Sequence, residues 1–199
     1  EKGSGVGIRM RTVKEQQALS IIRTLLIAGY PAYFVGGYVR DVLLGRTVQD
    51  IDIATAATPD EVIRLFPRTI PTGIQHGTVT VLAGGIPFEV TTFRQETEYK
   101  DFRRLADVEF IGDLIEDLRR RDFTINAMAM DVTGKLIDPF GGEEDLRARR
   151  LRAVGLAHER FSEDALRMLR CIRFASEYEL TIDPATWEAL LDSLPLLKH

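Results

Sequence analysis

The stretch Phe34-Val-Gly-Gly-Tyr-Val-Arg-Asp-Val-Leu-Leu-Gly-Arg-Thr-Val-Gln-Asp-Ile-Asp-Ile-Ala-Thr55 decides the fold. Its first apolar residues predict a strand that ends at Gly36-Gly37. The amphipathic segment 38–44 predicts a short helix, which Gly45 stops. Segment 50–53, Asp-Ile-Asp-Ile, alternates as a strand does. The order is therefore strand, glycine turn, helix and acidic strand.

The acidic strand brings two carboxylates together. In an extended strand Asp50 and Asp52 point to the same face, about 6–7 Å apart, while the isoleucines face the core. At an effective dielectric of about 20 two such charges repel by roughly 2–3 kcal/mol. An exposed strand face explains the pair only if a cation offsets this cost. Carboxylate oxygens suit Mg²⁺, so we predict Asp50 and Asp52 as catalytic metal ligands.

The glycine turn supplies features of an anion site. Gly36 and Gly37 precede a helix, whose first amides and dipole favour negative groups. Arg40 follows within the first turn and can offer a forked cation to phosphate. A glycine pair alone is common in turns. Beside an Asp-x-Asp strand, it predicts part of a nucleotide site.

These residues resemble the first motif of the class II tRNA nucleotidyltransferase and bacterial poly(A) polymerase family. That family belongs to the polymerase-beta-like nucleotidyltransferases. The resemblance implies an α+β fold, in which a catalytic head with a mixed sheet and flanking helices is followed by an α-helical neck. It also implies metal-dependent nucleotidyl transfer. The matching positions are Gly36-Gly37, Arg40-Asp41, Leu43 to Arg46 and Asp50-Ile51-Asp52.

A hairpin is expected next to the acidic strand. Residues 77–82 and 86–93 are β-formers on either side of Gly84-Gly85, which predicts two strands joined by a tight turn. We expect these strands to run antiparallel to the acidic strand. Family members often carry a third carboxylate on a neighbouring strand, so the resemblance implies Glu89 as a third catalytic acid. A surface-facing strand residue is the alternative.

Residues 119–126, Arg-Arg-Arg-Asp-Phe-Thr-Ile-Asn, resemble the family's second motif. The resemblance implies that Arg121 holds the triphosphate together with Gly37 and Arg40, and that Asp122 and Asn126 face the ribose. Both polar side chains can pair with hydroxyls, and a contact to the 2′-OH distinguishes ribonucleotides from deoxyribonucleotides. Asp122 can also cap the next helix, and the two roles are compatible.

A later helix carries a polar stripe. Ser162 is expected to cap it, with Glu163 and Asp164 in the first turn, while Leu166, Leu169, Ile172 and Phe174 supply packing. The polar residues recur every third position at Asp164, Arg167, Arg170 and Arg173. A solvated arginine face is the alternative reading of this stripe.

Glu163-Asp164-x-x-Arg167 resembles the family's base-selecting motif. The resemblance implies that Asp164 and Arg167 read the Watson–Crick edge of C or A in place of a nucleic-acid template. Arg170 and Arg173 would contact phosphate or hold that pair in place.

Residues 95–106 are polar, carry charges of both signs and lack core periodicity, which predicts a mobile loop. In the family a flexible loop at this place is tied to the final adenosine addition. Its presence therefore favours an enzyme that adds more than cytidines. This chain has Leu105 where the family often has Pro.

Composition narrows the class of protein. The 199 residues are 45% hydrophobic and 28% charged, as in ordinary globular proteins, and the net charge of −4 excludes a uniformly basic surface. Nucleic acid would therefore meet local arginine clusters. Cys171 is the only cysteine, so an intrachain disulfide is impossible and a reducing compartment is expected. Without a membrane-length apolar run or a signal-peptide pattern, we expect a cytoplasmic protein with no membrane partner.

We predict a flexible N-terminus at 1–12, a catalytic head at 13–142 and a helical neck at 143–199 that begins a longer helical region. The expected activity is template-independent addition of C, C and A, from CTP and ATP, to the 3′ end of tRNA. An A-adding enzyme or a poly(A) polymerase is the nearest alternative. A non-catalytic RNA-binding module is disfavoured, because paired acids repel RNA. The sequence leaves the oligomeric state open.

Overall fold

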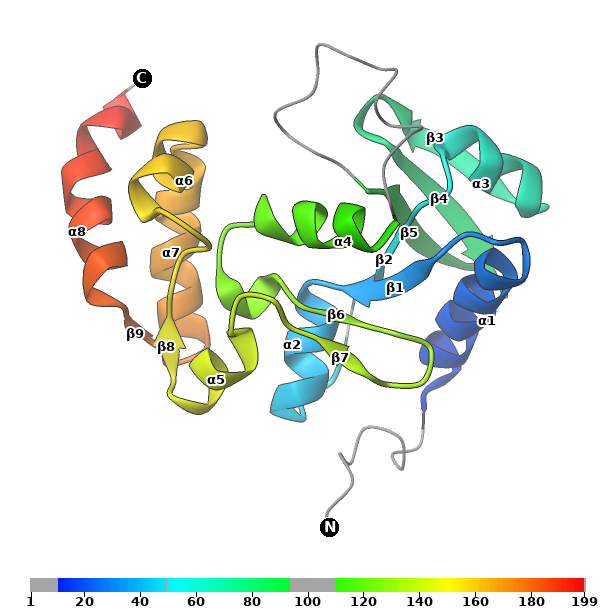
Figure 1. Cartoon of the computed structure of the whole chain (residues 1–199), viewed down its shortest axis with the longest axis horizontal. Coiled ribbons are helices and arrows are strands. Elements are labelled where there is room, and N and C mark those ends of the chain that lie inside the picture. Colours follow the sequence, from blue (N-terminus) through cyan, green and yellow to red (C-terminus); the bar gives the residue numbers. More distant parts are fainter. Residues whose placement is uncertain (1–10, 49, 94–109, 199) are drawn as a thin grey trace.

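A computed structural model of the chain describes residues 11–48, 50–93 and 110–198 (Figure 1). The helices are α1 (Val13–Ile27), α2 (Gly37–Leu44), α3 (Pro59–Leu65), α4 (Phe110–Arg119), α5 (Gly142–Arg147), α6 (Ala157–Glu163), α7 (Leu166–Glu177) and α8 (Pro184–Ser193), with short 3-10 helices η2 (Ile74–His76), η5 (Thr124–Asn126) and η6 (Leu194–Lys198). The strands are β1 (Ala32–Val35), β2 (Asp52–Thr55), β3 (Thr69–Gly73), β4 (Thr78–Ala83), β5 (Ile86–Thr92), β6 (Ala129–Met130), β7 (Leu136–Ile137), β8 (Arg150–Leu151) and β9 (Thr181–Ile182). The loop predicted at 95–106 lies outside the described residues.

The described residues form a seven-stranded mixed sheet in the order β3-β4-β5-β2-β1-β6-β7. The predicted α+β class is confirmed, as is the β4–β5 hairpin. The expected strand direction was wrong for β5, which pairs parallel to β2, whereas β4 runs antiparallel to both. Helix α3 returns the chain to the end of the sheet where β2 began. The two reversals β3–β4 and β4–β5 then bring β5 into the direction of β2.

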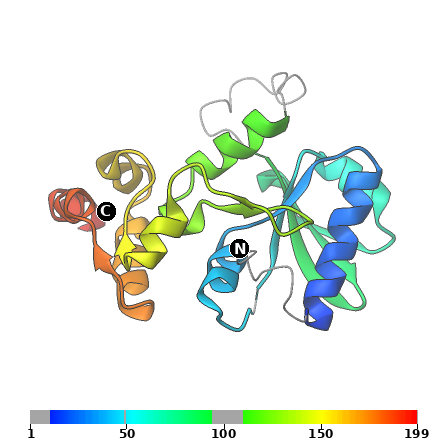
Figure 2. The same cartoon turned by 60° about the horizontal axis from the view of Figure 1, so that its bottom comes forward.

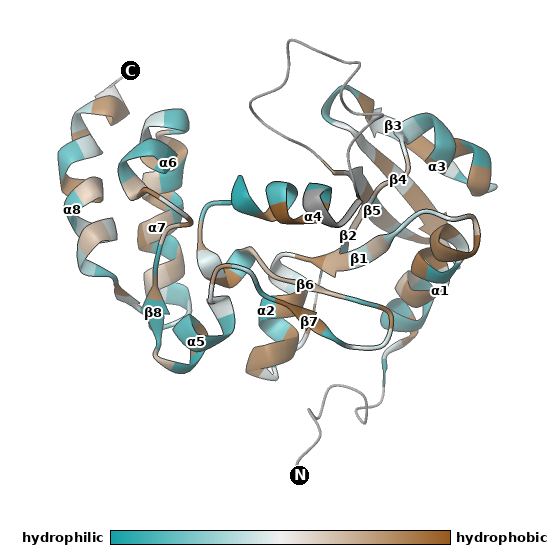
Figure 3. Ribbon diagram, viewed as in Figure 1, coloured by the Kyte–Doolittle hydropathy of each residue, from teal (hydrophilic) through white to brown (hydrophobic). Residues whose placement is uncertain are grey.

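The sheet is covered on both faces. Phe34 and Ile53 belong to the large apolar cluster with α1 and α2, whereas the next residues, Val35 and Ala54, belong to a second cluster with Leu114 and Leu118 of α4. Figure 2 shows α4 and α2 on opposite sides of the sheet, and Figure 3 shows apolar colouring along its central strands. Since alternate strand residues share a face, Asp52 lies on the same face as Ala54, toward α4.

Local signals explain the elements that frame the acidic strand. Helix α2 ends at Gly45, which has the left-handed conformation typical of a helix C-terminus, with φ +68°. Helix α3 begins with a complete capping box, in which Thr58 and Glu61 satisfy each other's backbone amides, and with Pro59 in its first turn. These ends hold short helices at fixed positions on the sheet.

Helices α6, α7 and α8 form a separate helical part at one side of the sheet (Figure 1). Ser162 does not cap its helix as expected. It lies inside α6, where its hydroxyl donates to the carbonyl of His158 at 2.7 Å. The chain instead breaks at Asp164, which has extended backbone angles and accepts a hydrogen bond from the Leu166 amide at 2.9 Å. This local cap competes with helix continuation and starts α7.

The packing face of α7 also differs from the expected one. Leu166, Leu169 and Ile172 are 63%, 52% and 51% exposed, whereas Met168, Cys171 and Phe174 are buried. Because α7 begins after the break at Asp164, its orientation is set by this second apolar row. Arg167, Arg170 and Arg173 each precede a buried residue and therefore border the packed side.

Helix α5 packs against the sheet part of the molecule rather than beside α6 to α8. It contacts η5 and α2, and its residue Asp145 is fully buried. The division predicted at residue 142 stays a prediction, with α5 on the sheet side. Within the residues that the structure describes, no helix combines the length and apolar character needed to cross a bilayer.

Candidate active site

A cavity of about 800 Å³ lies between the sheet part and α7. Seven arginines and five carboxylates line it, so it is strongly polar with an excess of positive charge. It brings together most of the residues predicted from sequence: Gly36, Gly37, Arg40, Asp50, Asp52, Arg121, Asp122, Asn126, Arg167, Arg170 and Arg173. Among the described residues, Glu89 and Asp164 do not line it.

The predicted acids lie where two parallel strands meet. Asp50 is exposed just before β2, and Asp52 is half-buried as the first residue of β2. Glu89 of β5 is the register partner of Asp52. Burial raises the pKa of Asp52, Glu89 and Asp50 raise it further, and Arg121 opposes them. Negative charge thus accumulates at this edge of the cavity.

The carboxylates fit a divalent cation in part. In the described portion of the chain no group of three or more His, Cys, Asp or Glu side chains could hold a metal by itself. Mg²⁺ binds through one or two carboxylates together with water and substrate phosphates. Asp50 and Asp52 both line the cavity, and their oxygens are of the type that such an ion takes. Burial together with Glu89 and Asp50 raises the pKa of Asp52.

The glycine pair makes room for two guanidinium groups. A Cβ on Gly36 would come within 3.0 Å of Arg121 Nη1, and one on Gly37 within 3.0 Å of Arg40 Nη2. Gly36 also has φ +70° and ψ −136°, a combination that is essentially restricted to glycine. The turn therefore lets both arginines approach the backbone closely.

Arg121 is placed to meet an anion. Its Nε is buried and has no hydrogen-bond partner among the described residues. Burial lowers the pKa of this guanidinium, and the ion pair with Asp117 opposes that effect. Arginine nevertheless stays protonated at neutral pH. Because Arg121 lines the cavity, its positive charge favours a negatively charged ligand there.

Arg40 lies deeper than the sequence suggested. It is 7% exposed, its Nη1 donates to Asn126 Oδ1 at 2.6 Å, and its Nε pairs with Asp41 at 3.1 Å. Its guanidinium also lies over the ring of Tyr178, with Cζ 4.4 Å from the centroid. Several of its donors are thus engaged within the protein.

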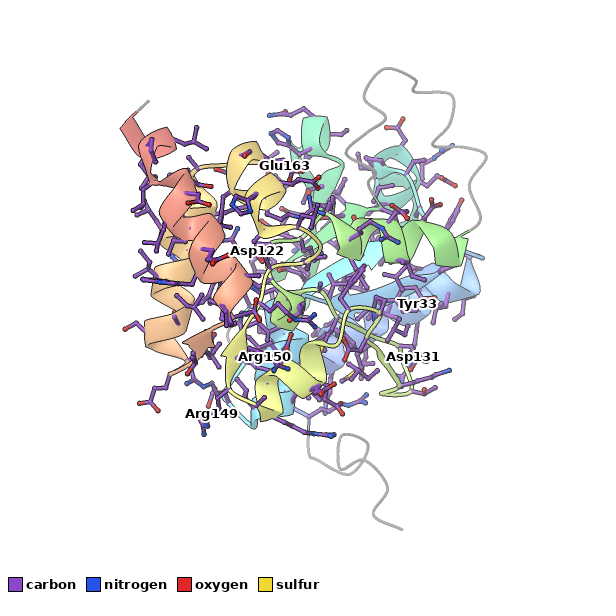
Figure 4. The ribbon with its side chains drawn as sticks, turned by 60° about the vertical axis from the view of Figure 1, so that its left-hand side comes forward. Tyr33, Asp122, Asp131, Arg149, Arg150 and Glu163 are labelled. Carbon is purple, nitrogen blue, oxygen red and sulfur yellow. The ribbon has the colours of Figure 1, made fainter. Side chains whose placement is uncertain are left out.

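Asp122 and Asn126 belong to a continuous set of polar contacts, here called the polar network: Arg40, Asn126, Asp122 and Arg170. Asp122 Oδ1 accepts from the Phe123 amide at 2.7 Å and from Asn126 Nδ2 at 3.2 Å. Its Oδ2 pairs with Arg170 at 2.7 Å. Asp122, labelled in Figure 4, is buried. The residue therefore stabilises its own turn and also ties it to α7.

The acid beside Arg167 is Glu163 rather than Asp164. Arg167 Nη1 lies 2.7 Å from Glu163 Oε2, and Nη2 donates to the Arg120 carbonyl at 3.4 Å. Burial raises the pKa of Glu163, but hydrogen bonds from Arg167 and Arg160 outweigh it and the net shift is downward. Asp164 is exposed and caps α7.

Sequence reasoning missed several residues that line the cavity, among them Arg46, Thr47, Phe174, Glu177 and Tyr178. Arg46 stands in the first matched motif and could have been included on that ground. Tyr178 gave no signal, because it ends α7 far along the chain from α2, and only the fold brings the two together.

Known proteins resemble this chain in sequence and in fold. Residues 32–152 match the family described as the poly A polymerase head domain. The CCA-adding enzyme of Geobacillus sp. (strain WCH70) is 58% identical over 184 residues, which are 92% of this chain and 46% of that protein. The CCA-adding enzyme of Lactobacillus johnsonii is 55% identical over 180 residues, 90% of this chain and 45% of that protein.

Solved structures give the same result. The Bacillus stearothermophilus CCA-adding enzyme in complex with CTP is 50% identical with a TM-score of 0.85, covering 95% of this chain and 46% of that one. The Thermotoga maritima CCA-adding enzyme complexed with tRNA is 28% identical with a TM-score of 0.79, covering 96% and 44%. The chain thus spans about half the length of these relatives. With a match that covers more than half of its residues and this agreement in fold, the chain belongs to the poly A polymerase head domain family.

Proposed function

We propose that the chain carries the nucleotidyltransferase site of a CCA-adding enzyme, which adds C, C and A from CTP and ATP to the 3′ end of tRNA. One observation carries the proposal. A single cavity joins two acids, Asp50 and Asp52, to an arginine-lined wall and to the polar network. The relatives named as CCA-adding enzymes share this region at more than half of their aligned positions.

The acids supply the metal site of the proposal. Asp50 and Asp52 would hold Mg²⁺, with Glu89 one strand away adding negative charge. Two Mg²⁺ ions, when bound, activate the attacking 3′-hydroxyl and stabilise the leaving pyrophosphate. Arg121 lines the cavity beside Gly36 and would bring its positive charge to the triphosphate. Gly36 keeps the space beside that guanidinium open, and Gly37 does the same for Arg40.

The residues proposed to contact the ribose and the base also lie on the wall of the cavity: Asp122, Asn126 and the arginines of α7. Asp122 and Asn126 present an acceptor and an amide next to one another, which suits a pair of ribose hydroxyls. Arg167 lines the cavity and is held by Glu163, so its guanidinium would be the group that meets the base. Asp164 remains the proposed acidic partner of Arg167 in base selection, although its carboxylate caps α7 in this structure. Arg170 and Arg173 line the same wall.

An enzyme that adds only A, or a poly(A) polymerase, would use the same site. Incorporation of each labelled nucleotide with Mg²⁺ distinguishes them, on tRNA that ends at the discriminator base, after one C, or after two. Addition of C, C and A in turn is the expected result. A single A on the two-C substrate alone, or a long A tail, would replace the proposal with one of the alternatives.

A non-catalytic RNA-binding module predicts a different outcome. Such a module would bind tRNA without incorporating or binding nucleotide in a Mg²⁺-dependent way. Because the chain spans about half of its relatives, the assay should also be run with the tRNA at concentrations well above those needed by a full-length relative. Cytoplasmic location, as expected from the sequence, is part of this proposal.

A further inference from the structure

We infer that Tyr178 is a positioning residue for the ribose side of the site, acting through Arg40 and Asn126. The inference rests on the proposed function, since it concerns how that site recognises its nucleotide. Nothing in the two matched motifs points to Tyr178. It stands at the C-terminal end of α7, in the helical part, while Arg40 and Asn126 stand in the sheet part.

Tyr178 joins α7 to the middle of α2 and to the segment that follows it. Its ring is 8% exposed, with the Cζ of Arg40 4.4 Å from the centroid and the Cζ of Arg46 4.3 Å from it. Its hydroxyl donates to Asp41 Oδ1 at 3.4 Å. Arg46 in turn reaches the Glu177 carbonyl at 3.5 Å. The aromatic ring is therefore the common contact of two guanidinium groups, one from within α2 and one from just after its C-terminal end.

The contact continues from Arg40 into the polar network. Arg40 has only donors, so Asn126 must turn its oxygen toward it, as the 2.6 Å contact shows. The amide nitrogen of Asn126 then points to Asp122 Oδ1 at 3.2 Å. Arg40 thus fixes the orientation of the Asn126 amide, so that its nitrogen and not its oxygen meets Asp122. A change in Arg40 would release that orientation.

The ring of Tyr178 restricts a motion of Arg40 that its hydrogen bonds permit, namely the tilt of the guanidinium plane. Asn126 and Asp41 hold edges of the guanidinium, but in-plane hydrogen bonds permit it to tilt. An aromatic face stacked on a guanidinium opposes that tilt and favours the cation. Phe174 lies farther away, 5.3 Å from Arg40 Cζ. Tyr178 is therefore the closer aromatic support of Arg40.

The test compares Tyr178→Leu with Tyr178→Phe, using Trp187→Leu as the control. Trp187 is an exposed aromatic residue on α8, and it does not line the cavity. Dissociation constants for CTP and 2′-deoxy-CTP are measured with Mg²⁺, and KM and kcat for both nucleotides on tRNA. Tyr178→Leu should lower the preference for CTP over 2′-deoxy-CTP by about fivefold, acting on KM more than kcat, because a stacked cation contact is lost. Tyr178→Phe and Trp187→Leu should keep the wild-type preference.

Several outcomes would overturn the inference. An unchanged ribose preference in Tyr178→Leu would do so, and so would an equal loss in Tyr178→Phe, which would assign the effect to the hydroxyl and Asp41. If Tyr178→Leu does not fold, Arg40→Lys takes its place, since lysine keeps the charge but loses the fork. That variant should show the same loss of ribose preference, and a wild-type preference would overturn the inference.

Failure of the proposed function would look different. The wild-type chain would then bind neither CTP nor 2′-deoxy-CTP in the presence of Mg²⁺, and both proposals would fall. If the wild type discriminates between the two nucleotides and Tyr178→Leu discriminates equally well, only the role of Tyr178 is lost.

Discussion

Glu89 is the register partner of Asp52 across the only parallel pair formed by β2 among the described strands. Two carboxylates therefore share one face of the sheet, and the pKa of Asp52 is raised by its burial and by Glu89 and Asp50. The folded chain tolerates this charge although it opposes folding.

Asp52→Asn should abolish nucleotide transfer while stabilising the metal-free chain by on the order of 1 kcal/mol. A carboxyl whose pKa is raised by folding contributes stability below its usual pKa of about 3.9 and loses that contribution as pH rises through the raised value. The stability advantage of the variant should therefore grow from pH 4 upward and then level off, as measured by urea unfolding. Retained transfer, or a variant less stable than wild type at neutral pH, would contradict the role given to Asp52.

Glu89→Gln should separate an electrostatic role from a metal-binding one. Removal of this charge should lower the pKa of Asp52 toward its ordinary value, since Glu89 is one of the groups that raise it. With limiting Mg²⁺, the acidic limb of the pH profile should then shift to lower pH while the plateau rate changes little. A collapse of the plateau by about 100-fold or more would instead make Glu89 a third catalytic acid.

The elements with local signals could be predicted from the sequence. The start of α3 is indicated by Thr58, Pro59 and Glu61, and the end of α2 by Gly45. Both are visible in the sequence because a helix cap is formed by residues that are close together in the chain. Strand β3 was missed, since Thr69-Ile-Pro-Thr-Gly73 contains a proline and lies at the sheet edge, where little of it is buried.

The site was predicted residue by residue but not in its contacts. The motifs identified Asp122, Asn126 and Arg40, yet their mutual hydrogen bonds follow from the packing of α2 on η5. The sequence predicted Asp164 as the acid beside Arg167, whereas the structure has Glu163 there, because the helix breaks at Asp164. The Asp164 carboxylate accepts the Leu166 amide at that break, and Phe161 before it and Met168 after it are both fully buried. Helix propensity alone does not reveal the break.

Arg167→Ala should blur the choice among CTP, ATP, GTP and UTP, because the side chain that offers donors to the base is removed. Glu163→Gln should act in the same direction but more weakly, since glutamine can still accept one hydrogen bond from Arg167. Competition among the four labelled nucleotides on one tRNA substrate measures both effects. Arg147→Ala is the control, because Arg147 pairs with Glu143 on the surface of α5 and does not line the cavity. Unchanged selectivity in Arg167→Ala would contradict a role of α7 in base selection and leave it only a packing role.

Asp145→Ala should destabilise the chain more than any surface acid of α5. Asp145 is fully buried and accepts hydrogen bonds from the Thr124 hydroxyl, from Arg150 Nε at 2.8 Å and from Arg152 Nε at 3.0 Å. Loss of a buried partner costs about 3–5 kcal/mol, and we expect the lower end because both arginines are partly exposed and can turn to water. Glu143→Ala removes a surface pair on the same helix and should cost about 0–1 kcal/mol. Urea unfolding of the two variants measures the difference. Equal losses would show that Asp145 does not hold η5, and with it Asn126, against α5.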